Sequence, residues 1–368
     1  MRFFYIGVIV IFVQFFFSKL SAKEIKLGMS TALTGPTKSL GLQLRQGAQL
    51  YFSRYNKTPA GLKNPITLIS YDDGYEPHNT VLNTRKLLED DNVFALFGYV
   101  GTPTSKAVMP LISKENTIFF SPFTGAEFLR TPVKRNIFNI RSSYYNEAAT
   151  QVEYFIKKLK LKNVALFIQA DDFGLAASKG YAQALKAQGI ENYIQVRYKR
   201  NTIDIDIATK QLIELNPDVI FCIGTYSPIG NLINNLRAKN ISSKVVMLSF
   251  AGARALQQEL KNFDEIYITS VLPDPHSSEL AIIEQYRQAM LENELSNESL
   301  EGYINAATFV RVISQISGEI TQHSFIHSAE QLNISLGGVG IKFSPNNHQA
   351  LNKTYLNVIT QNGLLPIN

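Results

Sequence analysis

The chain has 368 residues, of which 45% are apolar and 18% charged, so it can bury the cores of two ordinary domains and is not a disordered polypeptide. Its formal charge is +6, but the lysines and arginines are scattered, which argues against a nucleic-acid partner. The single cysteine, Cys222, excludes an intrachain disulfide and lies in an apolar run, so we expect an inert, buried thiol. No spacing resembles a zinc site, and we expect no metal.

The first 22 residues have the pattern of an export signal. Arg2 precedes an almost unbroken apolar stretch over residues 3–17, and a short polar region ends in Ser21-Ala22. This order predicts a signal peptide over residues 1–22, cleaved after Ala22. A membrane anchor is the alternative, but about 15 apolar residues are short against the roughly 20 that span hydrocarbon. We therefore expect a periplasmic protein that does not insert into the membrane after cleavage.

From residue 24 onward, short β-branched runs alternate with segments of helical period, a pattern typical of βα units around parallel sheets. In the first half the pattern predicts strands at 25–29, 66–71, 93–97 and 117–120, with helices at 42–55, 79–88 and 104–113. In the second half it predicts strands at 163–168, 193–197, 219–223, 244–248 and 266–270, with helices at 146–159, 175–187, 203–215 and 229–239.

After residue 274 this alternation stops. Three helical patterns follow at 278–292, 300–316 and 328–334, and a hairpin-like strand pair is predicted at 339–343 and 353–360. The sequence therefore predicts an α/β fold with two doubly wound parallel-sheet lobes. Ligands of such sheets bind beyond the carboxyl ends of the strands, so two facing lobes would share one cleft.

Several short motifs in a fixed order resemble a known family. They are STALTGP at 30–36 followed by Gly41, Gly47 and Asn56, Tyr71-Asp72-Asp73 with Glu76-Pro77, Gly98 with Thr102 and Ser105, Ser121-Pro122, and Asp172-Phe173-Gly174. Together they resemble the type I periplasmic binding proteins, and most closely the leucine/isoleucine/valine-binding protein family, from about residue 25 to 360.

This resemblance implies two α/β lobes joined by three crossover segments, which close on a ligand and deliver it to an ABC permease of the inner membrane. It implies a first lobe of 23–143 to which 274–335 returns, and a second lobe of 144–273 completed by 336–368. We expect a monomer without a cofactor. The run 34–39 (TGPTKS) is not a phosphate loop, because Pro36 lacks an N–H and the residue immediately before Lys38 is Thr37 instead of glycine.

The turn after the third predicted strand, residues 98–104, is the first candidate ligand site. Pro103 fits the first position of a helix, which would leave Thr102 as the N-cap. Helix N-termini present unpaired N–H groups that suit a carboxylate. The resemblance implies that the Thr102 hydroxyl binds the ligand carboxylate, and a plain helix cap is the alternative.

The other candidate ligand residues follow from the resemblance. At the second turn it implies that backbone groups of Phe123 and Gly125 face the ligand. The family often has threonine at position 125, so one hydrogen bond is missing here or comes from Thr124. In the second lobe the matching positions are Phe173, Thr225 or Tyr226, and Phe250.

Phe250 departs from the family pattern, which has an acidic residue there that pairs with a ligand ammonium. A buried ammonium without a partner costs several kcal/mol. Free leucine should therefore bind poorly, unless Asp171, Asp172 or Asp274 substitutes; for Asp172 a turn or cap is the favoured interpretation. Tyr99 joins Phe123, Phe173, Tyr226 and Phe250 in an expected aromatic cleft. We expect a neutral or carboxylate-bearing ligand with an apolar or aromatic body.

Three functions compete at this point. The first is an exported solute-binding protein that captures a small polar solute (amino-acid, amide or carboxylate-like) for an ABC-type importer, and the alternative is a periplasmic ligand-sensing subunit that feeds a signalling partner. The third, an enzyme, lacks support: there is no Gly-x-Ser-x-Gly elbow or His-Glu-x-x-His motif, and none of the five histidines lies at the predicted turns. We expect Asp72 and Asp73 to brace the first lobe or cap the next helix.

Overall fold

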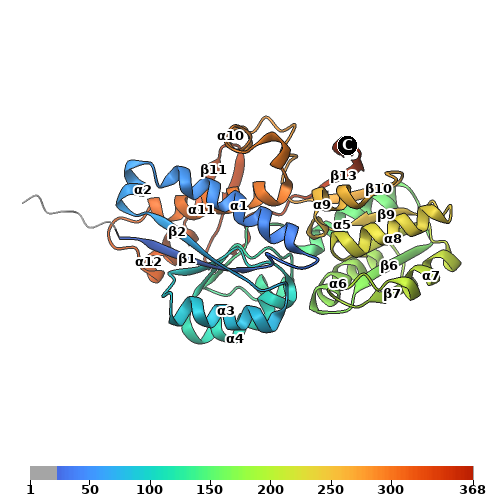
Figure 1. Cartoon of the computed structure of the whole chain (residues 1–368), viewed down its shortest axis with the longest axis horizontal. Helices are drawn as coiled ribbons and strands as arrows, with labels where there is room; N and C mark the ends of the chain where they lie inside the picture. The colour runs from blue at the N-terminus through green and yellow to red at the C-terminus, as the bar shows by residue number, and fades with distance from the viewer. Residues whose placement is uncertain (1–22, 368) are drawn as a thin grey trace, which may run out of the picture.

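The computed structural model describes residues 23–367 as two lobes that lie side by side, each a β-sheet with helices on its faces (Figure 1). The predicted signal peptide lies outside the described residues. Within residues 23–367, no helix combines the length and the apolar character that a membrane crossing requires.

The first lobe contains a five-stranded parallel sheet in the order β2-β1-β3-β4-β5. Its strands are β1 (Ile25–Thr31), β2 (Ile66–Asp72), β3 (Ala95–Phe97), β4 (Ile118–Phe120) and β5 (Ile137–Phe138). The helices between them are α1 (Lys38–Tyr55), α2 (Pro59–Lys63), α3 (Pro77–Glu89) and α4 (Thr102–Glu115). The chain later returns to this lobe with α10 (Ala281–Ala289), α11 (Asn297–Ser314) and α12 (Gln322–Glu330).

Helices α1 and α11 pack so closely that their backbones are in contact, and this contact attaches the returning segment to the first lobe. A Cβ atom on Gly47 would lie 1.8 Å from the carbonyl oxygen of Ser299, and one on Gly302 would lie 2.2 Å from that of Leu44. Only glycine fits at both positions. The early motif with Gly47 is therefore a packing feature of this helix pair.

The second lobe contains a seven-stranded sheet in the order β14-β13-β10-β9-β8-β6-β7. Its parallel strands are β6 (Val164–Gln169), β7 (Ile194–Tyr198), β8 (Val219–Ile223), β9 (Lys244–Met247) and β10 (Ile266–Ser270), and β13 (Tyr355–Thr360) and β14 (Gly363–Pro366) add an antiparallel edge. The helices are α5 (Tyr144–Val152), which continues as a π-helical segment over Glu153–Lys158, α6 (Asp172–Ala187), α7 (Asp206–Leu215), α8 (Tyr226–Ala238) and α9 (Ala253–Glu259).

The chain passes between the lobes three times: between β5 and α5, between β10 and α10, and before β13. The predicted α/β fold of two doubly wound lobes with three crossovers is thus confirmed. The strands and helices predicted up to residue 270 are all present, with ends that differ by a few residues.

Two predictions near the C-terminus are wrong. Residues 339–343 and 353–360 do not form a hairpin, because β12 (Val339–Lys342) pairs with β11 (Asn333–Leu336), while β13 pairs with β10 and β14. The helix predicted at 328–334 is instead the end of α12 followed by β11. Since Phe343 packs on Phe138 of the first lobe, we propose that the chain returns to the second lobe after Leu351 rather than at residue 336.

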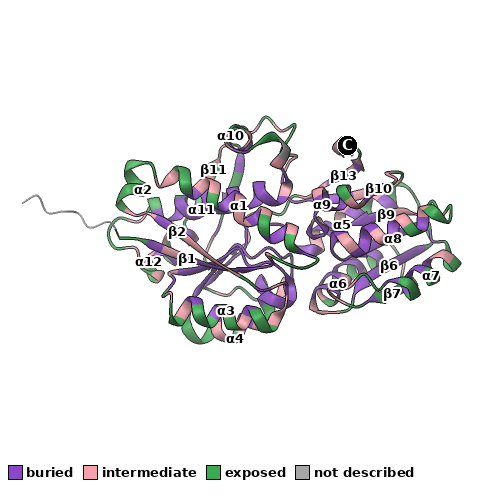
Figure 2. Ribbon diagram, viewed as in Figure 1, coloured by how far each residue is buried: buried purple, intermediate pink, exposed green. Residues whose placement is uncertain are grey.

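The larger of two clusters of buried apolar residues includes side chains of both lobes, and the smaller lies within the first lobe around Leu96 and Phe119. Figure 2 shows buried residues along the sheets of both lobes. Burial of apolar side chains stabilises each lobe, and the shared part also stabilises their contact. The buried residues at the lobe boundary lie next to the carboxyl ends of the parallel strands, where ligands of such sheets bind.

Candidate functional site between the lobes

Turns from both lobes meet at the boundary. The segments that follow β2, β3 and β4 contribute Tyr75, Thr102 and Phe123 from the first lobe, and those that follow β6 and β9 contribute Phe173 and Phe250 from the second. All five side chains are buried. Four of the predicted site residues (Thr102, Phe123, Phe173 and Phe250) are therefore brought to one region.

Thr102 is the first residue of α4 and not its N-cap, so that prediction is wrong. The cap is Gly101, whose φ of 105° places it in the left-handed region, and Pro103 is the second helical residue. The Thr102 side chain makes no capping bond; its hydroxyl lies 2.7 Å from the Thr124 hydroxyl and 3.5 Å from the Tyr144 hydroxyl. Three hydroxyl groups therefore lie together at the start of a helix.

Gly125 has no room for a side chain. A Cβ atom there would lie 2.5 Å from Cδ1 of Tyr144, whose backbone N–H donates to the Gly125 carbonyl at 2.8 Å. The Tyr144 hydroxyl lies 3.2 Å from the Thr124 hydroxyl. Thr124 and Tyr144 thus place hydroxyls near the position where the family often has threonine, and Gly125 offers only backbone.

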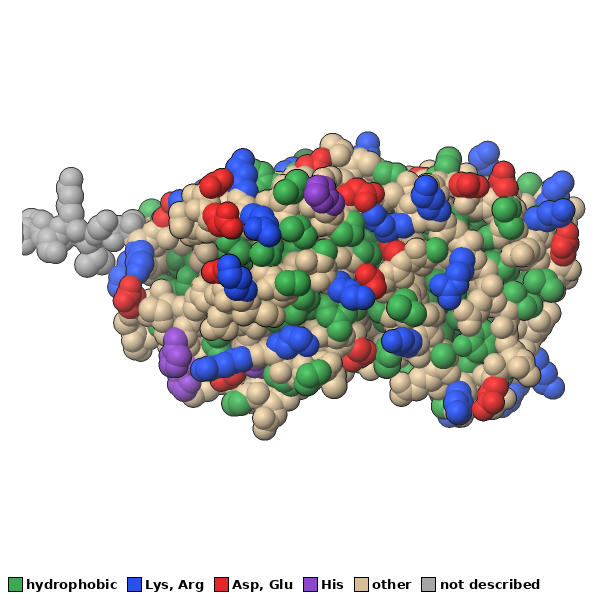
Figure 3. Space-filling model, turned by 90° about the horizontal axis from the view of Figure 1, so that it is seen from below, with side chains coloured by type: hydrophobic (Ala, Val, Ile, Leu, Met, Phe, Trp, Pro, Cys, Tyr) green, Lys and Arg blue, Asp and Glu red, His purple; other side chains and the backbone are tan. Residues whose placement is uncertain are grey.

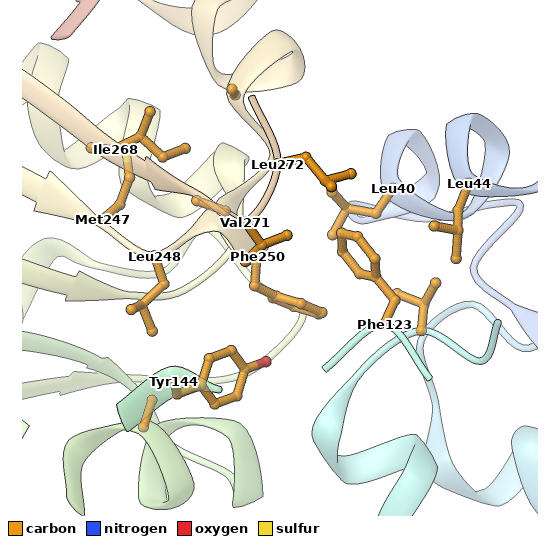
Figure 4. Packing of buried hydrophobic residues seen from close by; sticks show 14 of the residues in the cluster. Leu40, Leu44, Phe123, Tyr144, Met247, Leu248, Phe250, Ile268, Val271 and Leu272 are labelled. Atoms are coloured by element: carbon orange, nitrogen blue, oxygen red, sulfur yellow. The ribbon is translucent and has the colours of Figure 1, made fainter. Parts of the chain in front are cut away.

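The aromatic rings of the two lobes touch across the boundary. The Phe250 ring of the second lobe lies 5.6 Å from that of Phe123 and 6.2 Å from that of Tyr75, both in the first lobe, and 4.7 Å from that of Phe173 (centroid distances). Figure 4 shows Phe250 pointing from the second lobe toward the loop of Phe123. Aromatic pairs at these distances are attractive by about 0.5–1.5 kcal/mol beyond their buried area, so the rings stabilise the closed arrangement.

Three predicted site residues lie outside this ring cluster. The Tyr99 ring points into the core of the first lobe, 5.3 Å from the Phe119 ring, and its hydroxyl lies 2.9 Å from that of Thr84. Thr225 is the buried N-cap residue of α8 in the second lobe. Tyr226 does bridge the lobes, because its hydroxyl accepts from the Ser39 N–H at 3.4 Å. The structure therefore gives no support to Tyr99 as a cleft residue.

The aspartates proposed as substitutes for the acid missing at Phe250 are occupied elsewhere. Asp171 caps α6 by accepting from the N–H groups of Phe173 and Gly174 at 2.9 and 3.1 Å. Asp172 pairs with Lys106 at 2.6 Å, and Asp274 accepts from Ser277 at 2.7 Å. Each of the three aspartates therefore already has a partner within the protein.

Asp72 and Asp73 brace the first lobe, as predicted. Asp72 accepts from the N–H groups of Leu33 and Gly74 at 2.8 and 2.9 Å. Asp73 accepts from the Ser30 hydroxyl at 2.8 Å and the Tyr75 N–H at 2.8 Å. Burial raises the pKa of Asp73 to about 6.

A polar latch holds the lobes together on one side of the rings. Arg200 of the second lobe donates to the Tyr75 carbonyl and to the Glu76 carboxylate of the first lobe. The amide of Asn201 donates to the same carboxylate at 2.6 Å, and the Arg200 Nε lies 3.7 Å from the Asp171 carboxylate. We call Arg200, Asn201 and Glu76 the latch.

On another side lies a buried ionic group. The Arg141 guanidinium, on the first crossover, lies 4.1 Å above the Phe123 ring, and its Nε is 3.5 Å from Glu301. Burial raises the pKa of Glu301 to about 7; Arg141 opposes this rise, while Glu298 and Glu147 add to it. Burial also raises the pKa values of Glu298 and Glu147.

Sequence reasoning missed several residues that shape this region: Tyr75, Arg141, Tyr144, Glu147, Arg200, Glu298 and Glu301. Glu298 and Glu301 lie more than 150 residues from Arg141 in the chain, so no local motif predicts that they come close to it. The sequence offered one signal, which is that the acidic pair Glu298 and Glu301 lies at the start of α11, a helix with an apolar face. Within residues 23–367 no group of three or more His, Cys, Asp or Glu side chains is placed to hold a metal ion.

Comparisons with known proteins agree with this architecture. The family model described as Periplasmic binding protein matches residues 24–363. The Leu/Ile/Val-binding protein BraC3 of Rhizobium johnstonii is 25% identical over 220 residues, which span 59% of this chain and 59% of that protein.

Two solved structures share the fold. The crystal structure of a possible leucine/isoleucine/valine-binding protein from Rhodopirellula baltica is 32% identical, with a TM-score of 0.89 over 95% of this chain and 97% of that one. A branched-chain amino acid ABC transporter protein from Thermus thermophilus, with bound valine, is 17% identical, with a TM-score of 0.81 over 94% and 96% of the two chains.

Two sheet-based lobes, three crossovers and a boundary lined by residues of both lobes define a two-lobed binding protein. The chain belongs to the Periplasmic binding protein family, in its leucine/isoleucine/valine-binding branch. The members named above are binding proteins and not enzymes, in agreement with the lack of catalytic motifs in the sequence.

Proposed function

We propose that this protein is exported, captures a small polar organic solute between its lobes, and presents it to an ABC-type importer. The observation that carries the proposal is the meeting of Phe123 and Tyr75 from one lobe with Phe250 from the other at the ends of the parallel strands. A ligand that contacts both sets of turns favours the closed state over the open one, and this difference in affinity drives lobe closure.

Within this proposal the ligand contacts are the Thr102 hydroxyl, backbone groups of Phe123 and Gly125, and the rings of Phe173 and Phe250. The hydroxyls of Thr102, Thr124 and Tyr144 at the start of α4 suit a carboxylate or carbonyl, because helix N-termini carry unpaired N–H groups and partial positive charge. Tyr226, which bonds to Ser39 across the boundary, completes the set.

A thermal-shift screen of the mature chain tests the binding function. Branched-chain amino acids lead the screen because the relatives are named for them, followed by amides, short carboxylates and aromatic acids. A ligand that binds only the folded state raises the melting temperature, by an amount that grows with its concentration over Kd. At least one solute should do so and show one-to-one binding by calorimetry. If every class left the melting temperature unchanged, the binding function would be wrong.

Export is tested separately. The full chain, expressed in a Gram-negative host, should appear in the periplasmic fraction with Lys23 as its first residue. Retention in the membrane with residues 1–22 intact would contradict the cleaved signal peptide.

A further inference from the structure

The second lobe has a surface groove of about 750 Å³, and none of its lining residues belongs to the ring cluster at the lobe boundary. One wall is the end of α5 with the π-helical segment that continues it, and the other is formed by β13, β14 and the residues next to them. The hydroxyl groups of Thr150 and Thr354 are hydrogen-bonded between the two walls. We call it the lysine groove. Cavities of about 300–1,000 Å³ are typical of small-molecule sites, so this groove has room for an organic ligand.

Part of the lysine groove is apolar and aromatic. It is lined by Leu356, Pro366 and Ile367 from the strand pair and by the rings of Tyr154 and Tyr355. Leu356 is buried, whereas the other four side chains keep part of their surface in contact with solvent. An apolar group that occupied the groove would remove this surface from water, which is favourable.

The same groove is strongly basic. Among the described residues that line it, four lysines accompany one carboxylate, that of Glu153; the lysines are Lys157, Lys158, Lys160 and Lys353, all exposed. Glu153 accepts from Lys157 at 2.7 Å. On the face of the molecule that Figure 3 shows, basic side chains are instead scattered among acidic ones. The concentration of lysines in one hollow therefore favours an anionic occupant.

Two of these lysines lie against the aromatic rings of the groove. The Nζ of Lys353 is 4.6 Å from the centre of the Tyr355 ring, and that of Lys158 is 5.3 Å from the centre of the Tyr154 ring. An ammonium group is attracted to the face of a ring at such distances. Positive charge is thus held next to the apolar surface, where a single ligand can contact a ring and an ammonium group together.

The helical wall of the groove has an unusual backbone. Residues Glu153–Lys158 form a π-helix, and the Leu159 N–H donates at 3.0 Å to the carbonyl of Tyr154, five residues earlier. Such turns are rare and are found frequently at functional sites. The π-helical segment carries Tyr154, Lys157 and Lys158, so the irregular backbone coincides with the basic and aromatic side chains of the groove.

We propose that the lysine groove binds a small organic anion with an apolar body, such as an aromatic carboxylate, at a site separate from the gap between the lobes. The anionic group lies near Lys160 and Lys353, and the apolar body lies against Tyr355, Leu356 and Ile367. Because the groove is built from the second lobe alone, this inference does not rest on the proposed function. Solvent screens the exposed lysines, so they select the sign of the ligand charge while the apolar contacts supply much of the affinity.

The test compares probes that differ in charge or in body. Calorimetry on the mature chain is run with naphthalene-2-carboxylate, with naphthalen-2-ylmethylamine, which has the same rings and the opposite charge, and with inorganic phosphate, which has no apolar body. The carboxylate should bind at least tenfold more tightly than either of the others, and its affinity should fall as salt is raised from about 20 to about 200 mM. No binding of the carboxylate, or equal binding of the amine, would overturn the inference.

Variants locate the bound anion. Lys160→Gln combined with Lys353→Gln should lower the affinity for naphthalene-2-carboxylate at least fivefold. Lys179→Gln combined with Lys186→Gln removes two exposed lysines of α6 in the same lobe and is the matched control, with unchanged affinity expected. Glu153→Gln removes the carboxylate that lines the groove, so it should raise the affinity about threefold.

The outcomes separate this site from others. Wild-type affinity in the Lys160 and Lys353 variant, or an equal loss in the control, would place the anion elsewhere, including the gap between the lobes, and would refute the inference. If the chain sedimented with phosphatidylglycerol vesicles and did not bind the free carboxylate, the groove would be a membrane contact and the inference would be wrong.

Discussion

The latch predicts that a single side chain controls the balance between open and closed lobes. Arg200→Ala removes the hydrogen bonds from the second lobe to the Tyr75 carbonyl and the Glu76 carboxylate, and it also removes the ion pair with Asp171 at 3.7 Å. The fold of each lobe should persist, because these bonds to the first lobe are made only when the lobes are closed.

The size of the effect follows from the exposure of the partners. Hydrogen bonds to a charged group contribute about 1.5–3 kcal/mol when well buried, but the Glu76 side chain is 45% exposed and Arg200 is 18% exposed. Because solvent screens these partly exposed groups, the free energy that Arg200 contributes to the closed state should be at the low end of this range, about 1.5 kcal/mol. A loss of this size is roughly a tenfold change in the closing equilibrium, and ligand affinity should fall by up to the same factor.

Small-angle scattering and calorimetry measure the two consequences. Without ligand, the Arg200→Ala variant should have a larger radius of gyration than the wild type, and its affinity for the screened ligand should be several-fold to tenfold lower. Arg197→Ala is the matched control, since it removes an arginine from an exposed position three residues earlier. If the two variants had the same radius and the same affinity, the latch would have no role in closure.

Three further predictions concern the site and its support. Thr102→Ala combined with Phe123→Ala should weaken binding at least tenfold, about 1.4 kcal/mol, with an unchanged circular dichroism spectrum; unchanged affinity by calorimetry would remove both residues from the site. The pKa of Glu301 is raised from 4.5 to about 7, so the folded chain holds its proton more tightly than the unfolded chain, and stability should fall as the pH rises from 5 to 8, by about 3 kcal/mol at most. Glu301→Gln should flatten that decline in urea unfolding, and an equally steep decline in the variant would show that another group causes it. Gly47→Ala should cost about 2 kcal/mol or more by overpacking against α11, whereas Gly340→Ala, with open space around its Cβ position, should be close to neutral in the same assay.

The fold was largely predictable because its signals are local. Continuous apolar runs such as Val219–Ile223 coincide with a strand buried on both faces, and the Asn216-Pro217 sequence ends α7 where expected. The C-terminal region was harder, because an alternating run such as Val339–Lys342 does not indicate its partner. Short elements were missed for a related reason: β5 has two residues and is fixed by its pairing with β4 and not by its own pattern.

Only the part of the candidate site that lies in the short sequence motifs could be predicted. Thr102, Phe123, Phe173 and Phe250 follow strands whose ends converge, and the order of the strands places them together. The prediction that Tyr99 lines the cleft has no support in the structure, because its ring lies in the core of the first lobe. Successive residues at the end of a strand point to opposite sides of the sheet, and the sequence does not show which side faces the cleft. The burial of Arg141 against Glu301 depends on a crossover and a returning helix, which no single segment encodes.

The distance between the lobes is the most direct test of a binding protein that closes on its ligand. Cys222 is buried, with a pKa raised by burial, so spin labels should attach only to cysteines introduced at the exposed Ser113 of α4 and Lys179 of α6. Double electron–electron resonance measures the distance between the two spin labels. Without ligand this distance should be longer or more broadly distributed, and it should become a single shorter distance when a solute from the screen saturates the protein. If calorimetry confirmed saturation and the distance distribution did not change, the solute would bind outside the gap and the two-lobed closing mechanism would be contradicted.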